Sequence, residues 1–124
     1  MAHLANDLAV TLPEDRPGTL AKALTAIGQA GINLEGYAEL EGVVHVLTMD
    51  VAATRRALEE AGFQVMRQQQ VVLVPVSDRP GTAARAFERI AAAKINIRYS
   101  YLATGNRLVI GTSDLQAALK ALEM

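Results

Sequence analysis

The first half of the chain alternates between two hydrophobic patterns, one typical of strands and one typical of helices. Short segments rich in strand-forming residues predict strands at 8–12, 32–39, 43–49 and 63–66. Apolar residues three or four positions apart, at Leu20, Leu24 and Ile27, predict a helix between the first two strands. A second helix is expected after Asp50, whose carboxylate can cap it. The predicted order of elements is βαββαβ.

The second half repeats this pattern over fewer residues. Strands are expected at 71–76, 96–102 and 107–111, and a final helix is expected after Asp114. The order is βαββα, so this half has no fourth strand. In a ferredoxin-like sheet of order 4-1-3-2 that strand pairs with strand one, where Pro75 has no N–H to donate. An open strand edge invites pairing with another chain, so we expect a homodimer that covers it.

A repeated pentapeptide supports this division. Asp-Arg-Pro-Gly-Thr occurs at Asp15–Thr19 and again at Asp78–Thr82, 63 residues later. The match continues at the same offset, where Leu24, Ile27, Ile32 and Asn33 correspond to Phe87, Ile90, Ile95 and Asn96. A repeat of about sixty residues has the size of a small domain. We therefore predict two domains of α+β class, at residues 1–70 and 71–124.

Composition excludes several classes of function. The net charge is −1 and aromatic residues make up 4% of the chain, which argues against nucleic acid as a partner. The chain has no cysteine, so disulfides and thiolate metal sites are excluded, and neither a metal nor a cofactor is expected. No apolar run approaches the ~20 residues of a transmembrane helix. The first residues lack the pattern of a secretory signal, so we expect a cytoplasmic protein that does not bind membranes.

Charge is divided unevenly between the two halves. Residues 1–70 carry five Lys or Arg and nine Asp or Glu, a net of −4, whereas residues 71–124 carry seven and four, a net of +3. Two interpretations stay open: the halves face each other across an interface, or the charges are spread over solvated surfaces. Exposed ion pairs contribute only ~0–1 kcal/mol, so the imbalance by itself does not decide between them.

The repeated loop has the chemistry of a small-ligand site. Proline presets its own φ and glycine permits a positive φ, so the loop turns tightly into the following helix. The first N–H groups of that helix have no partner within it, and they suit a carboxylate. Asn33 and Asn96, expected at the entrance of the second strand of each half, offer amide groups nearby. Asp15, Asp78 or an asparagine oxygen could accept from an ammonium, so an amino acid fits this site.

These residues resemble a known family. The segments Asp-Arg-Pro-Gly-Thr-Leu-Ala and Ala-Gly-Ile-Asn-Leu, and their counterparts Asp-Arg-Pro-Gly-Thr-Ala-Ala and Ala-Lys-Ile-Asn-Ile, are similar to the opening of an ACT domain, twice over. The resemblance extends from Leu8 to Glu123. It implies two ferredoxin-like βαββα(β) repeats, each an antiparallel sheet with helices on one face, the second lacking its last strand. It also implies a regulatory protein that binds an amino acid between ACT units.

The resemblance places two half-sites on this sequence. The first comprises Asp15, Arg16, Pro17, Gly18, Thr19, Asn33 and Leu34, and the second comprises Asp78, Arg79, Pro80, Gly81, Thr82, Asn96 and Ile97. ACT units usually accompany a catalytic or DNA-binding domain, and neither is found in this sequence. We therefore expect a stand-alone regulator, with an enzyme as its possible partner.

Each of these features also has a purely structural interpretation. The loops could serve only as turns, with Thr19 and Thr82 as helix caps, and the two asparagines could bind only backbone. Arg16 and Arg79 could be solvated rather than ligand-binding. His3 and His45 form a metal pair only if they meet in space, and His45 lies between Val44 and Val46, as expected of a half-buried structural residue.

Two other functions compete with an amino-acid sensor. An ACT-based association module would regulate a partner without any ligand. An acylphosphatase-like enzyme would use an arginine and an asparagine, as in Arg16 with Asn33 or Arg79 with Asn96, but the proline after each arginine removes an N–H that a phosphate would need. No nucleophile, base and orienting acid can be assembled, so we do not expect an enzyme.

Overall fold

The computed structural model describes residues 1–13 and 17–123, and these form two compact units. The first unit is Asn6–Gln69. The second unit consists of Met1–Ala5 together with the chain from Gln70 onward. The predicted division into domains 1–70 and 71–124 stays a prediction, but the first residues of the chain belong to the compact unit that contains the second half.

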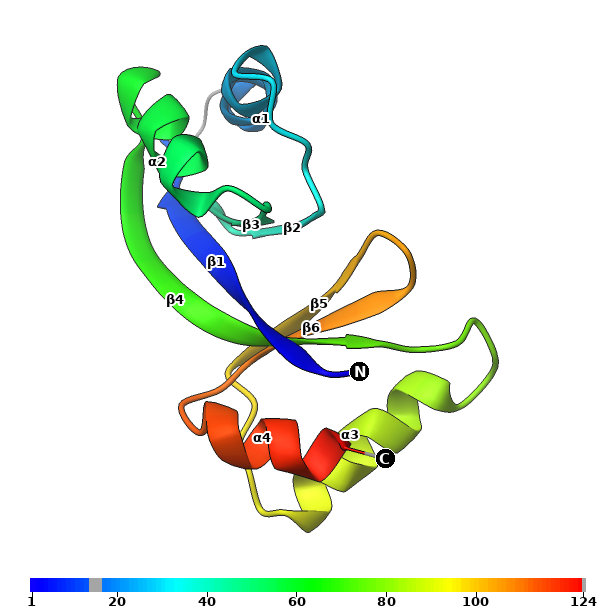
Figure 1. Ribbon diagram of the computed structural model, residues 1–124. Coiled ribbons are helices and arrows are strands. Elements are labelled where there is room, and N and C mark those ends of the chain that lie inside the picture. The colour runs from blue at the N-terminus through cyan, green and yellow to red at the C-terminus, as the bar shows by residue number, and fades with distance from the viewer. Residues whose placement is uncertain (14–16, 124) are drawn as a thin grey trace. The chain divides into compact units, whose positions relative to one another are not determined.

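Ten elements make up the two units (Figure 1). They are β1 (His3–Thr11), α1 (Thr19–Gln29), β2 (Gly36–Leu40), β3 (Val43–Leu47), α2 (Val51–Glu60), β4 (Gln64–Pro75), α3 (Thr82–Ala92), β5 (Tyr99–Ala103), β6 (Arg107–Gly111) and α4 (Leu115–Leu122). The strands predicted at 63–66 and 71–76 are therefore one continuous strand, β4. β2 and β5 begin later than predicted, three residues after Asn33 and Asn96 respectively.

The sheet corrects the predicted fold class. The six strands are hydrogen-bonded in the order β1-β3-β2-β5-β6-β4, and this order closes into a barrel. The prediction of two open ferredoxin-like sheets, the second lacking its last strand, is therefore wrong. The physical reason is the length of β1 and β4, nine and twelve residues, because each strand runs from one unit into the other.

The start of β1 also removes the open edge that the sequence predicted. Residues His3–Ala5 belong to the second unit, and β4 has both β6 and β1 as neighbours in the strand order. Ala2 and Leu4 pack against the hydrophobic core of that unit. The argument for a homodimer from an unpaired strand edge therefore no longer holds, and the dimer itself stays a prediction.

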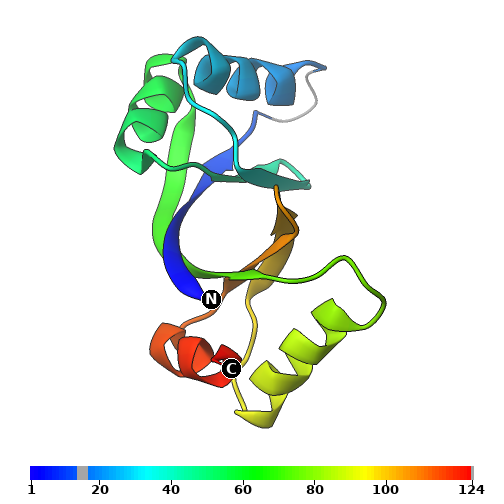
Figure 2. The ribbon, with the colours of Figure 1, turned by 45° about the vertical axis from the view of Figure 1, so that its right-hand side comes forward.

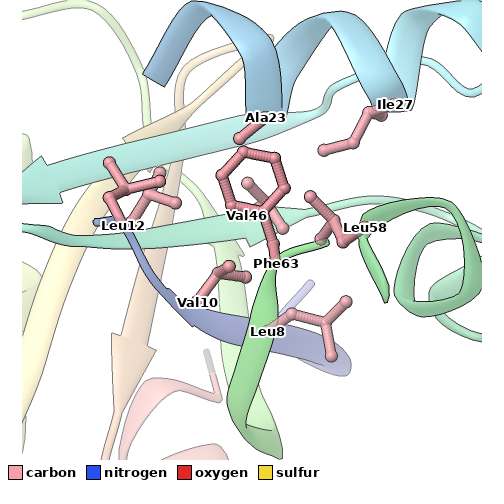
Figure 3. Close-up of a cluster of buried hydrophobic side chains, with 9 residues drawn as sticks. Leu8, Val10, Leu12, Ala23, Ile27, Val46, Leu58 and Phe63 are labelled. Atoms are coloured by element: carbon pink, nitrogen blue, oxygen red, sulfur yellow. The ribbon is translucent and has the colours of Figure 1, made fainter. Parts of the chain in front are cut away.

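The core of the first unit lies between its strands and its helices (Figure 3). Leu8 and Val10 of β1, and Leu12 directly after it, point into this cluster. They contact residues of β3, α1 and α2 and the phenylalanine directly before β4: Val44, Val46, Ala23, Ile27, Leu58 and Phe63. Each fully buried side chain of this size contributes roughly 1.5–3 kcal/mol, so the cluster fixes α1 and α2 on one face of these strands.

The second unit has an equivalent core with a small change in register. Val72 and Val74 of β4 face Ile90, Ile110 and residues of α4, as Leu8 and Val10 do in the first unit. Strand positions thus correspond at an offset of 64, whereas the loops and following helices correspond at 63. The loop before α3 is therefore one residue shorter than the loop before α1. In Figure 2, α3 and α4 lie side by side, as do α1 and α2.

The two units differ most in the side chains on the other face of their strands. Asp7 is fully buried, and its Oδ2 lies 2.9 Å from Nδ1 of His45. The corresponding positions of the second unit hold Val71 and Val109, both also fully buried. A carboxylate can be buried at this position because it is hydrogen-bonded, whereas two valines need no partner. The first unit therefore has a polar pair where the second has an apolar one.

The two units also differ in which strand of a pair carries the glycine and which carries the large residue opposite it. In the first unit Gly36 pairs with Leu47, and in the second unit Tyr99 pairs with Gly111. The Tyr99 ring covers the glycine so closely that a Cβ on Gly111 would lie 2.4 Å from it. Tyr99 also stacks on Tyr101, with ring centroids 6.4 Å apart. Gly111 is thus required by the neighbouring ring, and not by its own backbone conformation.

The two predicted aspartate caps are confirmed. The backbone N–H of Ala53 donates to Asp50 at 3.0 Å, and that of Ala117 donates to Asp114 at 3.4 Å. Each carboxylate satisfies one of the unpaired N–H groups at the start of its helix, which stabilises α2 and α4 by about 1 kcal/mol each. These caps fix where the two helices begin after β3 and β6.

We expect Gly111→Ala to lower the free energy of unfolding by about 1–3 kcal/mol, because the added methyl group must displace the Tyr99 ring. Urea unfolding of the full chain measures this loss. In a Tyr99→Ala background the same substitution should cost much less, since the methyl group then meets no ring. An equal cost in both backgrounds would show that Tyr99 is not the cause.

Candidate functional site

The loops that carry the repeated pentapeptide each lead into a helix through a glycine. Gly18 and Gly81 are the N-cap residues of α1 and α3, with φ of 90° and 88°. Asp15 and Arg16 lie outside the described residues. In the second unit the loop is held by its own backbone, because the N–H of Arg79 donates to the carbonyl of Ser77 at 2.9 Å. Both loops therefore use glycine for a positive φ, which other residues adopt at a cost.

Neither threonine of the pentapeptide caps its helix. Both α1 and α3 lack a side-chain cap and have no acidic residue in the first turn. The Thr82 hydroxyl points back into the loop instead, where the carbonyl oxygens of Ser77 and Arg79 lie at 2.5 and 3.0 Å. The interpretation of Thr19 and Thr82 as caps is therefore wrong. Among the described residues, the partial positive charge at the start of α3 is left without a side-chain acceptor.

The two asparagines lie in the segments before β2 and β5 and are exposed. The Asn33 side chain donates to Oε2 of Glu35 at 2.7 Å. The backbone carbonyl of Asn96 accepts from the Thr112 hydroxyl at 2.8 Å. Leu34 packs against the core of the first unit, whereas Ile97 is 36% exposed. Asn33 thus holds its own segment through its side chain, whereas Asn96 contributes only its backbone carbonyl, and the use of either side chain by a ligand stays a prediction.

Each unit has a cleft beside its pentapeptide loop. The cleft of the second unit has a volume of about 290 Å³ and is lined by Val74, Pro75, Val76, Ser77, Thr82, Arg85, Ala86, Arg89 and Leu122. The cleft of the first unit has a volume of about 240 Å³ and is lined by Pro13, Pro17, Gly18, Thr19, Lys22, Ala61, Gly62 and Phe63. Neither lining includes the asparagine of its half-site. The structure therefore brings the loops together with helix residues that the sequence analysis did not select.

Cations occupy matching positions in the two clefts. Lys22 and Arg85 are each the fourth residue of their helix. The Lys22 ammonium lies 5.9 Å from the centroid of the Phe63 ring, within the range of a cation–π contact. In the second cleft Arg89 follows Arg85 by one helical turn, and it donates to the backbone carbonyl of Glu123 at 3.1 Å. The signal for this pair was present in the sequence as two arginines four residues apart, directly after the loop.

The structure gives His45 a hydrogen-bonded partner, Asp7. His45 is partly buried and its ring is engaged with Asp7, in agreement with a structural role. Among residues 1–13 and 17–123 there is no group of three or more His, Cys, Asp or Glu that could hold a metal ion. Within the same ranges, every helix is too short or too polar to cross a bilayer.

Comparison with known proteins gives a clear result for the fold only. No protein-family profile matches the chain, and no curated protein does. Protein BT0572 from Bacteroides thetaiotaomicron is similar in structure, with a TM-score of 0.85 and 25% identity, over 98% of this chain and 88% of that one. The ligand-free regulatory subunit of aspartate kinase from Thermus thermophilus has a TM-score of 0.60 and 21% identity, over 97% and 93% of the two chains. The likeness supports an ACT-type fold.

A larger enzyme contains a similar region. Aspartokinase III from E. coli, in complex with lysine and aspartate, has a TM-score of 0.59 and 18% identity. The match covers 97% of this chain but only 31% of that enzyme. At these identities the likeness to the kinases concerns the fold alone. How many ACT repeats the chain contains stays a prediction.

We expect Gly81→Ala to lower the free energy of unfolding by about 1–2 kcal/mol, because a Cβ is unfavourable at a positive φ. No clash contributes, since the nearest atom to such a Cβ is a flexible arginine terminus at 3.9 Å. Gly28 lies within α1 at no positive φ, so Gly28→Ala should instead raise stability by roughly 0.5–1 kcal/mol. Thermal and urea unfolding of both variants measure these effects, and a loss of equal size at Gly28 would contradict this explanation.

Proposed function

We propose that the protein is a regulatory protein that binds a small molecule, an amino acid, through its pentapeptide loops. The observation that carries this proposal is the fold, which matches regulatory subunits of aspartate kinase over almost the whole chain. One similar kinase was crystallised with lysine and aspartate bound. A non-catalytic role agrees with these neighbours, which are regulatory subunits or regulatory domains.

The chemistry of the loops supports an amino acid as the ligand. The N-terminus of α3 has neither a side-chain cap nor an acidic residue in its first turn, so it offers N–H groups to a carboxylate. Asp78 lies in the same loop and is exposed, so its carboxylate is available to an ammonium group. In the proposed mechanism the ligand lies between ACT-type units, in a homodimer, and favours one arrangement of them. Such coupling typically amounts to ~1–3 kcal/mol, enough to change the activity of a partner enzyme several-fold.

We expect a thermal-shift screen of the twenty amino acids to give one or two selective hits, with lysine and aspartate as the first candidates. A ligand present at about 100 times its Kd and bound only to the folded state adds ~2.7 kcal/mol of stability. Asp78→Asn should abolish this shift, because the ammonium loses its partner. Glu88→Gln, which removes an exposed carboxylate from α3, should leave it unchanged. No response to any amino acid at millimolar concentration would favour an association module that works without a ligand.

The dimer is tested separately. We expect analytical ultracentrifugation at tens of micromolar to show a species of twice the chain mass, and the addition of an amino acid found in the screen to strengthen the association. The second effect follows because a ligand bound between two chains stabilises the state that contains both. A monomer under both conditions would overturn binding between two chains, but it would leave binding within one chain to be judged by the thermal shift alone.

A further inference from the structure

The cleft of the second unit has an apolar floor and a positively charged rim. Its floor is formed by Val74 of β4, Ala86 of α3 and Leu122 of α4, which are 8%, 8% and 6% exposed. Its rim carries Arg85 and Arg89, both exposed, and none of the described residues that line it is acidic. Its volume of about 290 Å³ is near the lower end of the range for small-molecule sites. An occupant of this cleft would meet apolar atoms at one end and guanidinium groups at the other.

The position of Arg85 is electrostatically unfavourable in the absence of an anion. A Cβ built on Gly81 would lie 3.9 Å from Nη1 of Arg85, so the guanidinium lies over the N-cap residue of its own helix. That end of the helix carries a partial positive charge, and cations are favoured at the opposite end. In α3 neither a side-chain cap nor a first-turn carboxylate offsets this charge. A guanidinium and uncapped N–H groups side by side form a site that an anion would stabilise.

The corresponding cleft of the first unit provides a contrast within the same chain. There Phe63 lines the cleft, and the ammonium of Lys22 lies over its ring. The cation of the first cleft thus has an aromatic partner supplied by the protein itself. The backbone N–H of Arg85 donates to the Gly81 carbonyl at 3.0 Å, but its guanidinium makes no hydrogen bond or ion pair with the part of the chain that the structure describes. This difference points to the second cleft as the one that binds an external ligand.

We propose that the second cleft binds a small monocarboxylate with an unbranched aliphatic tail. The carboxylate pairs with Arg85 and the start of α3, with Arg89 beside them, and the tail lies on Val74, Ala86 and Leu122. A free amino acid does not suit this cleft, because its ammonium would face two guanidinium groups without a carboxylate among the lining residues. This site shares the start of α3 with the proposed function, but it uses Arg85 and the apolar floor where the amino-acid ligand uses Asp78.

Isothermal titration of the full chain with sodium octanoate, butyrate, octanol and inorganic phosphate tests the proposal. Octanoate should bind, and butyrate should bind more weakly, since each buried methylene contributes about fourfold in affinity. Octanol lacks the charge and phosphate lacks the tail, so neither should compete with octanoate. Equal binding of phosphate and octanoate, or of octanol and octanoate, would overturn the assignment.

Matched variants locate the binding site. Arg85→Gln should weaken octanoate binding about tenfold or more, as expected for a lost charged hydrogen bond, and Arg89→Gln should weaken it as well. Lys22→Gln, the equivalent change in the first unit, should leave the affinity unchanged. Circular dichroism confirms that each variant is folded, and the amino-acid thermal shift should persist in Arg85→Gln. Octanoate affinity that does not change in Arg85→Gln would overturn the site while leaving the proposed amino-acid function untouched.

Discussion

The whole structure depends on two strands that are long enough to belong to both units. β1 and β4 pass from one compact unit into the other, and each contributes apolar residues to both hydrophobic cores. In β1, Leu4 packs on the second core and Leu8 lies in the first. In β4, Val65 packs on the first core and Val72 lies in the second. The backbone of each of these strands is therefore continuous from one unit to the other.

The two units reach similar packing with different chemistry. Asp7 and His45 are hydrogen-bonded at positions where the second unit has Val71 and Val109. Similarly, the second unit places a tyrosine ring over Gly111, whereas the first has Leu47 at that position opposite a glycine. A buried polar pair contributes little net stability but is costly to break, while apolar pairs depend on shape alone. The two units therefore share the pairing of their strands and differ in the buried side chains on this face.

The two clefts are also in equivalent places with different side chains. Each begins at the same loop and has a cation on the fourth residue of the helix, yet one cation contacts an aromatic ring and the other has no partner in the described chain. Both helices begin at a glycine N-cap, which has no side chain to accept from their first N–H groups. Two related loops can thus differ in what they bind while the fold around them stays constant.

The sequence by itself determined the features that depend on near neighbours. The aspartate caps of α2 and α4, the glycine turns before α1 and α3, and the alternating core residues of β1 all follow from interactions within a few positions. The strands predicted at 63–66 and 71–76 are one strand, which continues through the polar residues 67–70, because sheet hydrogen bonds come from the backbone whatever the side chains are. Only the tertiary structure decided that β1 and β4 are shared and that α3 lies beside Leu122 of α4 in one cleft. Those arrangements depend on pairing between residues far apart in the chain, for which local sequence carries no signal.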